Sequence, residues 1–188
     1  AFGPRKNAAI IEGSKAFSKE LMKKYGIPTA DYAVFTDKNQ ALSYVEEKGA
    51  PIVVKCDGLA LGKGVVVAQT LDEAREAVVN MMENKAFGEA GAKVVIEECM
   101  TGPEVTVLAF TDGKTIVPMP SSQDHKRAYD GDQGPNTGGM GAISPCPNYT
   151  PELSKVCMDT IFLPTIKALN AEGRTFQGVI YFGMMLTP

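Results

Sequence analysis

The stretch Pro51–Gln69, P-I-V-V-K-C-D-G-L-A-L-G-K-G-V-V-V-A-Q, contains two short runs of β-branched residues with a glycine-rich segment between them. The first run ends in Lys55, and the second, Val65–Val67, follows directly after Gly64. β-Branched residues favour strands, and glycines between two such runs favour a turn. The stretch therefore predicts a β-hairpin rather than a strand that leads into a helix.

The expected turn carries a second lysine among three glycines, in the order Gly58, Gly62, Lys63 and Gly64. Glycines leave backbone N–H groups uncovered and allow a ligand to approach the chain closely. Such N–H groups, together with the ammonium groups of Lys55 and Lys63, suit a polyphosphate. The alternative is a mobile surface hairpin whose glycines serve only the turn.

Two familiar nucleotide-binding signatures are excluded at this hairpin. A Walker A loop needs four residues before its Gly-Lys pair and a Ser or Thr after it, but only three residues separate Gly58 from Gly62, and Gly64 follows the lysine. The dinucleotide fingerprint also fails, because valines follow Gly64 and no third glycine opens a helix. A phosphate site here would be carried by a β-hairpin.

The composition is that of an ordinary globular chain of 188 residues, with 44% hydrophobic and 22% charged residues. This length suits one domain or two closely packed subdomains. The net charge of −3 and the scattered basic residues argue against a nucleic-acid surface. No apolar run reaches the roughly 20 residues of a membrane span, and no signal peptide is visible. We therefore expect neither a nucleic-acid nor a membrane partner.

Four cysteines, Cys56, Cys99, Cys146 and Cys157, show neither a CxxC pair nor a zinc spacing. Each lies among apolar residues, which predicts buried, reduced thiols. A cytoplasmic location fits this pattern.

The segment before the hairpin predicts helices and one strand. Ser14 is placed to cap a helix that runs to about Tyr25 and stops at Gly26. Lys15 then lies in the first turn, where the helix dipole disfavours a cation unless an anion compensates. A solvated surface lysine is the alternative. Residues 32–35 are typical of a strand, and Asp37 is placed to cap a further helix that ends at Gly49.

After the hairpin, Thr70-Leu71-Asp72-Glu73 matches a capping box and predicts a helix. Residues 93–97 predict a strand, and residues 105–110 predict another one with alternating exposure. Glu97 and Glu104 therefore flank a short linker. Such a linker can present backbone groups to a purine edge, and a carboxylate can accept hydrogen bonds from two ribose hydroxyls. Two surface acids beside a turn are the alternative.

Residues 118–147 show no hydrophobic period, which predicts a long irregular loop of functional character. Asp124, His125, Lys126 and Arg127 are adjacent in it, and residues 134–141 have the glycine content of a second backbone cradle. His125 could be a catalytic base or could only position the loop, since no Ser/His/Asp order or metal trio is present. A last helix is expected from Thr150-Pro151, and a buried strand over 178–186.

Together these segments resemble the ATP-grasp superfamily and, within it, the phosphoribosylamine–glycine ligases of purine biosynthesis. The resemblance covers essentially the whole chain and rests on these segments: F-G-P at 2–4, E-G-S-K at 12–15, the hairpin at 53–68, V-I-E-E at 95–98, F-T-D-G-K at 110–114, S-Q-D-H-K-R at 122–127 and G-P-N-T-G-G-M-G-A at 134–142. The last two are the most specific. Cys56 departs from the alanine that this family usually carries.

The resemblance implies an α+β ATP-grasp fold in which a nucleotide is held between two α+β subdomains. On this basis we expect a small lid subdomain over residues 30–92, inserted into a larger subdomain. Residues 93–188 would belong to the larger one, and the helices of residues 1–29 would join it.

The resemblance also implies site residues. Lys15 and Lys55 would reach the ATP phosphates, the turn at 58–64 would be the phosphate loop, Glu97 to Met100 would form the adenine hinge, and Glu104 would hold the ribose. The cofactor-binding residues expected are thus Lys15, Lys55, Gly58, Leu59, Gly62, Lys63, Gly64, Glu97, Glu98, Cys99, Met100 and Glu104.

On the acceptor side, the resemblance implies catalytic roles for Asp124, Lys126 and Arg127, and substrate contacts from Asp124, Arg127, Asn136, Thr137, Gly138 and Gly139. The implied reaction joins glycine to 5-phosphoribosylamine through a glycyl phosphate, with ATP and Mg²⁺ or Mn²⁺. Its first step depends mainly on positioning and charge neutralisation.

In the family, a further strand bears acidic and asparagine ligands to Mg²⁺, and none of them follows Pro188. Nor is the family's N-terminal substrate domain present. We therefore expect an ATP-grasp fragment, with no metal ligands of its own, that binds nucleotide weakly and does not turn over alone. The alternatives are an ATP-grasp ligase or carboxylase with another substrate, and a non-catalytic nucleotide-binding module.

Overall fold

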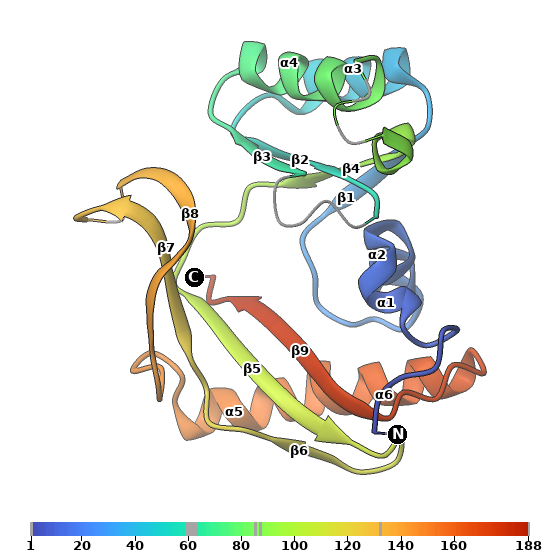
Figure 1. Ribbon diagram of the computed structural model, residues 1–188, viewed down its shortest axis with the longest axis vertical. Helices are drawn as coiled ribbons and strands as arrows, with labels where there is room; N and C mark the ends of the chain where they lie inside the picture. Colours follow the sequence, from blue (N-terminus) through green and yellow to red (C-terminus); the bar gives the residue numbers. More distant parts are fainter. Residues whose placement is uncertain (1, 59–63, 85, 87, 132, 188) are drawn as a thin grey trace. The chain divides into compact units, whose positions relative to one another are not determined.

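The computed structural model describes residues 2–58, 64–84, 86, 88–131 and 133–187, and its contacts divide the chain into two compact units (Figure 1). One unit, here the 100–188 unit, consists of Met100–Pro188 together with Ala1–Ala8. The other, the 9–99 unit, is Ala9–Cys99. The second unit is therefore inserted, in sequence, between two parts of the first. Both contain helices and antiparallel strands, which confirms the predicted α+β class.

The 9–99 unit is built on a four-stranded antiparallel sheet in the order β1-β4-β2-β3. Its strands are β1 (Tyr32–Phe35), β2 (Ile52–Cys56), β3 (Val65–Ala68) and β4 (Val94–Glu98). The predicted hairpin is confirmed, since β2 and β3 pair in register with Lys55 opposite Val65. Lys55 thus stands near the end of a central strand.

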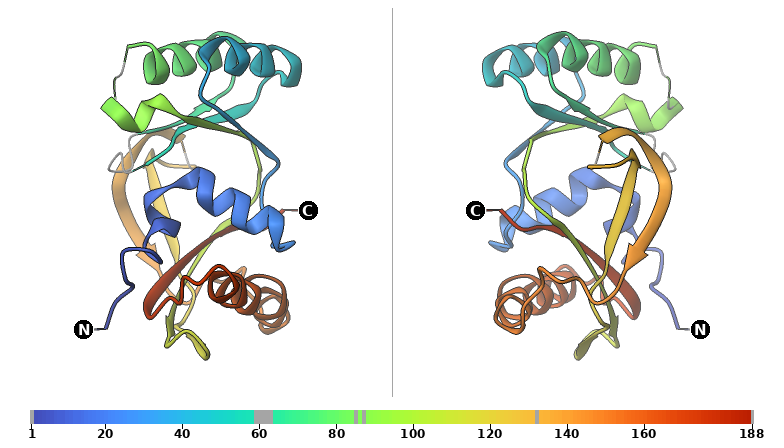
Figure 2. Two further views of the ribbon diagram at one scale, coloured as in Figure 1. Left: turned by 90° about the vertical axis from the view of Figure 1, so that its right-hand side faces the viewer. Right: turned by 90° about the vertical axis from the view of Figure 1, so that its left-hand side faces the viewer.

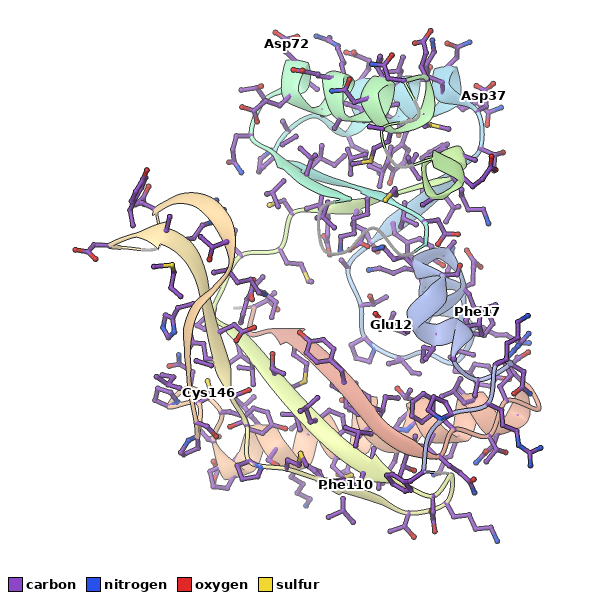
Figure 3. The ribbon with its side chains drawn as sticks, viewed as in Figure 1. Glu12, Phe17, Asp37, Asp72, Phe110 and Cys146 are labelled. Atoms are coloured by element: carbon purple, nitrogen blue, oxygen red, sulfur yellow. The ribbon has the colours of Figure 1, made fainter. Side chains whose placement is uncertain are left out.

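Two helices, α3 (Lys38–Lys48) and α4 (Leu71–Met82), cover one face of this sheet (Figures 1 and 2). The predicted caps are confirmed: Asp37 accepts from the N–H of Gln40, and Thr70 from that of Glu73. Figure 3 shows Asp37 and Asp72 at opposite ends of the helical layer, so the helices run antiparallel. Their inner faces and the sheet form the core, which includes Val45, Val54, Val78, Met81 and Ile96.

The same unit contains two N-terminal helices, α1 (Ile10–Gly13) and α2 (Lys15–Lys24), and a 3₁₀ segment, η1 (Gly88–Ala92). The cap of α2 is confirmed, because the Ser14 hydroxyl accepts from the N–H of Phe17. Gly91 allows η1 to approach α4: a Cβ there would lie 2.1 Å from the carbonyl oxygen of Met81.

The 100–188 unit has a three-stranded antiparallel sheet in the order β6-β5-β9. The strands are β5 (Glu104–Thr111), β6 (Ile116–Pro118) and β9 (Gly178–Met185). A helical segment crosses one face of the sheet (Figure 2), so β9 alternates between buried and exposed residues. The predicted strand over 178–186 is therefore confirmed, but its predicted burial holds for one face only, because the other face is not covered.

That helical segment consists of α5 (Pro151–Cys157), a π-helical turn η2 (Met158–Phe162) and α6 (Leu163–Ala171). Within η2, the N–H of Leu163 donates to the carbonyl of Met158, five residues back. Pro164 has no N–H to donate to the carbonyl four residues before it, and this disfavours a regular α-helical turn. Phe162 from this turn packs on Phe182 of β9, with ring centroids 4.3 Å apart.

Residues 118–147 contain a long β-hairpin, so the prediction of an irregular loop was wrong for most of this stretch. Its strands are β7 (Gln123–Tyr129) and β8 (Gln133–Ile143). No residue of β7 is buried, and the described side chains of β8 are exposed or half-buried. A strand that faces solvent on both sides needs no alternation of apolar and polar residues, and the hydrophobic period is therefore missing.

The units differ from the predicted subdomains in their boundaries. The division follows Cys99 rather than residue 92, because β4 pairs with both β1 and β2 and so belongs to the four-stranded sheet. Residues 9–29 group with this sheet rather than with the 100–188 unit. Over the part of the chain that the structure describes, no helix has the length and apolar character needed to cross a membrane.

Candidate functional site

A cluster of three charged side chains lies at the predicted phosphate end of the 9–99 unit. The Glu97 oxygen Oε2 lies 2.8 Å from the Nζ of Lys55 and 3.1 Å from the Nζ of Lys19. The exposed fractions are 5% for Glu97, 9% for Lys19 and 25% for Lys55. Two ammonium groups thus share one buried carboxylate, and the excess positive charge is presented mainly by Lys55.

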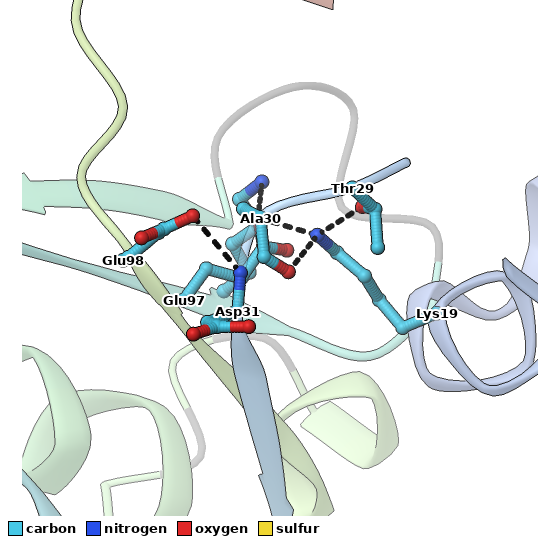
Figure 4. Close-up of polar contacts among 7 residues, drawn as sticks. Lys19, Thr29, Ala30, Asp31, Glu97 and Glu98 are labelled. Atoms are coloured by element: carbon cyan, nitrogen blue, oxygen red, sulfur yellow. Dashed lines mark hydrogen bonds and ion pairs between the residues drawn. The ribbon is translucent and has the colours of Figure 1, made fainter. Parts of the chain in front are cut away.

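Lys19 is held in this cluster by further contacts (Figure 4). Its ammonium donates to the hydroxyl of Thr29 at 2.8 Å and to the carbonyl of Ala30 at 3.4 Å. Burial lowers the pKa of Lys19; the charge and hydrogen bond of Glu97 oppose this effect, and the nearby Lys55 adds to it. Lys19 was not among the predicted site residues. The available signal was its position three residues after Ala16, on the face of α2 that is buried.

Lys15 and Asp57 connect the start of α2 to the end of β2. The Nζ of Lys15 donates to the carbonyl of Gly58 at 2.9 Å. The carboxylate of Asp57 accepts from the Ser14 hydroxyl and from the N–H of Ala16, each at 3.0 Å, and lies 3.5 Å from the Nζ of Lys93. Asp57 therefore supplies the anion that a lysine in the first helical turn requires. It also fixes Lys15 beside the hairpin.

The bonds around Asp57 outweigh its burial in setting its pKa. Burial raises the pKa of this carboxyl, but the backbone bond from Ala16, the hydroxyl of Ser14 and the charge of Lys93 lower it further, so that the net shift is downward from 3.8. Asp57 is thus held in its charged form.

The described part of the predicted phosphate loop consists of its two ends. Gly58 has a φ of +101°, a conformation that favours glycine, and the N–H of Cys56 donates to the carbonyl of Gly64 at 2.9 Å. Leu59, Gly62 and Lys63 lie outside the described residues, and their predicted roles remain predictions.

The predicted hinge begins within β4. Glu98 exchanges hydrogen bonds with Asp31: its N–H donates to the carbonyl of Asp31, and its side chain accepts from the N–H of Asp31 at 3.1 Å (Figure 4). Glu97 is directed instead toward Lys19 and Lys55. Cys99 and Met100 follow as half-buried residues outside any strand. The adenine role of these residues remains a prediction.

In the 100–188 unit, the predicted ribose carboxylate pairs with a predicted catalytic lysine. The Glu104 oxygen Oε2, at the start of β5, lies 2.6 Å from the Nζ of Lys126 in β7. Partial burial lowers the pKa of Lys126, but the hydrogen bond and charge of Glu104 outweigh this and raise it. Asp124, two residues earlier, is exposed and pairs through its backbone with Ala142.

The predicted glycine cradle is a wide bulge in β8. His125 pairs with Gly141 and Arg127 with Asn136, so residues 137–140 all face the single residue Lys126. The bulge is closed by Thr137, whose hydroxyl donates to the carbonyl of Lys126 at 2.8 Å and accepts from the N–H of Gly139 at 3.0 Å.

Arg127 stabilises the backbone of β8 on the N-terminal side of this bulge, because its Nη1 donates to the carbonyl of Gly134 at 2.7 Å. Lys126, Arg127, Thr137, Gly138 and Gly139 thus lie on the two strands of one hairpin. Their catalytic and substrate-binding roles remain predictions.

Chemically, the lysines of the 9–99 unit suit a polyanion, because Lys15 and Lys55 offer ammonium donors beside the backbone of the glycine-rich segment. A resident metal ion fits the described residues less well. Within residues 2–58, 64–84, 86, 88–131 and 133–187, no three side chains of His, Cys, Asp or Glu gather closely enough to hold one.

Comparison with known proteins gives one consistent family. The sequence profile of the phosphoribosylglycinamide synthetase ATP-grasp (A) domain matches residues 13–188. The phosphoribosylamine–glycine ligase of Halalkalibacterium halodurans is 54% identical over 186 residues, which is 99% of this chain and 44% of the relative. The chain thus spans less than half the length of this relative.

Solved structures agree with the sequence comparison. The crystal structure of the phosphoribosylamine–glycine ligase of Thermotoga maritima superposes with a TM-score of 0.89 at 37% identity, covering 99% of this chain and 47% of that one. The biotin carboxylase domain of a Hydrogenobacter thermophilus 2-oxoglutarate carboxylase, in complex with MgADP, superposes with a TM-score of 0.75 at 19% identity, covering 98% of this chain and 39% of that one. The second likeness shows the fold alone.

Proposed function

The chain belongs to the phosphoribosylglycinamide synthetase ATP-grasp (A) domain family, and from this we propose that it is the nucleotide-binding part of a ligase that joins glycine to 5-phosphoribosylamine with ATP. The observation that supports the nucleotide role is the lysine excess at the end of β2. Lys55 shares the buried carboxylate of Glu97 with Lys19, and Lys15 lies beside Gly58. These ammonium groups are opposite in charge to a triphosphate.

In the proposed reaction, a carboxylate oxygen of glycine attacks the γ-phosphorus of ATP, and the bond to the bridging oxygen breaks to release ADP. The amine of phosphoribosylamine then attacks the acyl carbon of glycyl phosphate, loses a proton and displaces inorganic phosphate. Lys15 and Lys55 would neutralise the charge on the transferring phosphoryl group and hold it in position. Such positioning and charge neutralisation account for most of the catalysis in phosphoryl transfer.

We assign the acceptor side to the β7–β8 hairpin. Arg127 carries a planar fork of donors that suits a phosphate or a carboxylate, and Lys126 adds a second positive charge. The bulge at 137–140 lies opposite Lys126, and Asn136 and Asp124 lie on the same hairpin. On the nucleotide side, Glu104 at the start of β5 would accept hydrogen bonds from the ribose hydroxyls of ATP after its ion pair with Lys126 has broken.

We propose that Mg²⁺ or Mn²⁺ accompanies the nucleotide. The described residues do not form a cluster to hold this ion. The proposed location is the cytoplasm, which agrees with four free cysteines. Flanking parts of the parent protein would complete the ligase, since the chain spans 44% of its relative.

Calorimetry of this chain with ATP and Mg²⁺ tests the proposal, with Lys55→Ala as the variant. A charge-assisted hydrogen bond contributes about 1.5–3 kcal/mol, so we expect wild-type binding in the micromolar to millimolar range and at least about tenfold weaker binding by the variant. Lys48→Ala is the control, because Lys48 is an exposed lysine of the same unit, on α3. Equal heats from wild type and Lys55→Ala would refute the assignment.

A ligase with another acceptor is the second candidate, since carboxylases share this fold. The profile match over residues 13–188 and the hairpin sequences at 122–127 and 134–142 favour phosphoribosylamine. Assays of the parent protein with phosphoribosylamine against simple primary amines separate the two. Equal rates would favour the other acceptor.

A further inference from the structure

The two lysines that share Glu97 are held very differently. Lys19 is 9% exposed and contacts the Glu97 carboxylate, the Thr29 hydroxyl and the Ala30 carbonyl, and its Nζ lies 5.6 Å from the centroid of the Tyr32 ring. Lys55 is 25% exposed, and its described contact is the one to Glu97. Lys19 is therefore fixed in place, whereas Lys55 can leave Glu97 by turning outward.

A buried carboxylate strongly resists losing its only counter-ion, because an uncompensated charge in a protein interior is costly. Glu97 is 5% exposed, so a single lysine partner would be bound to it tightly. With Lys19 also on the same oxygen, at 3.1 Å, Glu97 keeps a counter-ion when Lys55 moves away. Lys19 therefore lowers the free-energy cost of releasing Lys55 from Glu97.

We propose that Lys19 is a positioning residue: it keeps the Glu97 carboxylate compensated, so that Lys55 can exchange this carboxylate for the phosphate oxygens of a nucleotide. The inference rests on the proposed function for the identity of the anion that Lys55 takes. The charge-sharing among Lys19, Glu97 and Lys55 does not depend on that function, and it can be tested without nucleotide.

The first arm measures the rate at which Lys55 reacts with an amine-acylating reagent, by mass spectrometry of the intact folded chain, with Lys38 as internal reference. In Lys19→Met, Lys55 becomes the only counter-ion of Glu97, and its acylation slows by about tenfold because the ammonium is held on the buried carboxylate. In Glu97→Gln, Lys55 loses its partner and acylation is faster than in wild type. Lys19→Arg keeps the charge and the wild-type rate.

The direction in which the acylation rate of Lys55 changes distinguishes a positioning role of Lys19 from a purely structural role. A variant whose local structure is loosened exposes Lys55 and speeds its acylation. Unchanged or faster acylation of Lys55 in Lys19→Met therefore overturns the inference. Lys23→Met is the matched control, because Lys23 is an exposed lysine on the same helix, and it leaves the rate unchanged.

The second arm adds ATP and Mg²⁺ and measures binding by calorimetry. We expect Lys19→Met to bind about tenfold more weakly than wild type, since Lys55 must leave a carboxylate that retains no other cation, while Lys19→Arg binds within about twofold of wild type. In a Glu97→Gln background, Lys19→Met does not weaken ATP binding further. An equal loss in both backgrounds contradicts the inference.

The two arms separate failure of the inference from failure of the proposed function. If wild type binds no nucleotide but acylation follows the expected order, the nucleotide role fails and the charge-sharing holds. If Lys19→Met does not fold, the double variant Lys19→Met with Glu97→Gln, which removes one cation and the carboxylate together, replaces it. Lys55 must then react as fast as in Glu97→Gln alone, and slower acylation overturns the inference.

Discussion

At the residue scale, Asp57 is the contact that holds the start of α2 against the end of β2. Its carboxylate accepts hydrogen bonds from Ser14 and Ala16 and faces Lys93, and its side chain is 12% exposed. Each hydrogen bond to a charged group contributes about 1.5–3 kcal/mol, so Asp57→Asn should lower the free energy of unfolding by about 1–3 kcal/mol at pH 7. Urea denaturation of the variant and wild type measures this difference.

Asp57 should also make the stability of the protein depend on pH, in a direction that its pKa determines. The pKa of Asp57 is lowered on folding, so its stabilisation is fully present above the ordinary value of 3.8 and is lost as pH falls through the folded value. Wild type should therefore lose more stability than Asp57→Asn between about pH 5 and pH 2. Asp31→Asn, at an exposed aspartate of the same unit, is the control. Parallel curves for wild type and Asp57→Asn would contradict the assigned role.

Local features drew attention to Lys15, Lys55 and Glu104, and the family resemblance then implied that they contact the nucleotide; these roles remain predictions. Lys19 could not be predicted in the same way. Its burial depends on how α2 packs on the sheet, and its partner Glu97 is 78 positions away in sequence. The structure also shows that Glu97 and Glu104 already bind lysines, a pairing that no spacing indicates.

At the element scale, the contact between η1 and α4 depends on one glycine. A Cβ at Gly91 would lie 2.1 Å from the backbone oxygen of Met81, and only a backbone shift can relieve this. Overpacking of this kind costs about 1–3 kcal/mol, so Gly91→Ala should speed hydrogen exchange of the α4 amides. Gly13→Ala is the matched control, because a Cβ there meets nothing within 4 Å. Unchanged exchange in Gly91→Ala would show that η1 does not support α4.

Helices and the first hairpin were predictable because their ends carry local signals. Ser14, Asp37, Thr70 and Thr150 each accept a hydrogen bond from the first turn of a helix, as their positions indicated. The β7–β8 hairpin carries no such signal. Its strands face solvent, its pairing is interrupted at residues 137–140, and its glycines resemble a loop. Hydrophobic period identifies strands only where one face is buried.

At the scale of the whole molecule, the chain consists of two units, each with its own sheet and its own helical cover. The inserted 9–99 unit contains the lysine cluster, and the 100–188 unit contains the β7–β8 hairpin with Lys126 and Arg127. The α+β class followed from the resemblance to the ATP-grasp superfamily. The boundary at Cys99 did not, because it depends on β4 pairing with strands distant in sequence.

The central claim is that a triphosphate binds at the end of β2, and a crystal structure with a non-hydrolysable ATP analogue tests it most directly. We predict that the ammonium groups of Lys15 and Lys55 lie about 2.7–2.9 Å from phosphate oxygens. Lys55 should have left Glu97, and Lys19 should remain on it. Phosphates bound away from Lys15, with Lys55 still paired to Glu97, would contradict the account.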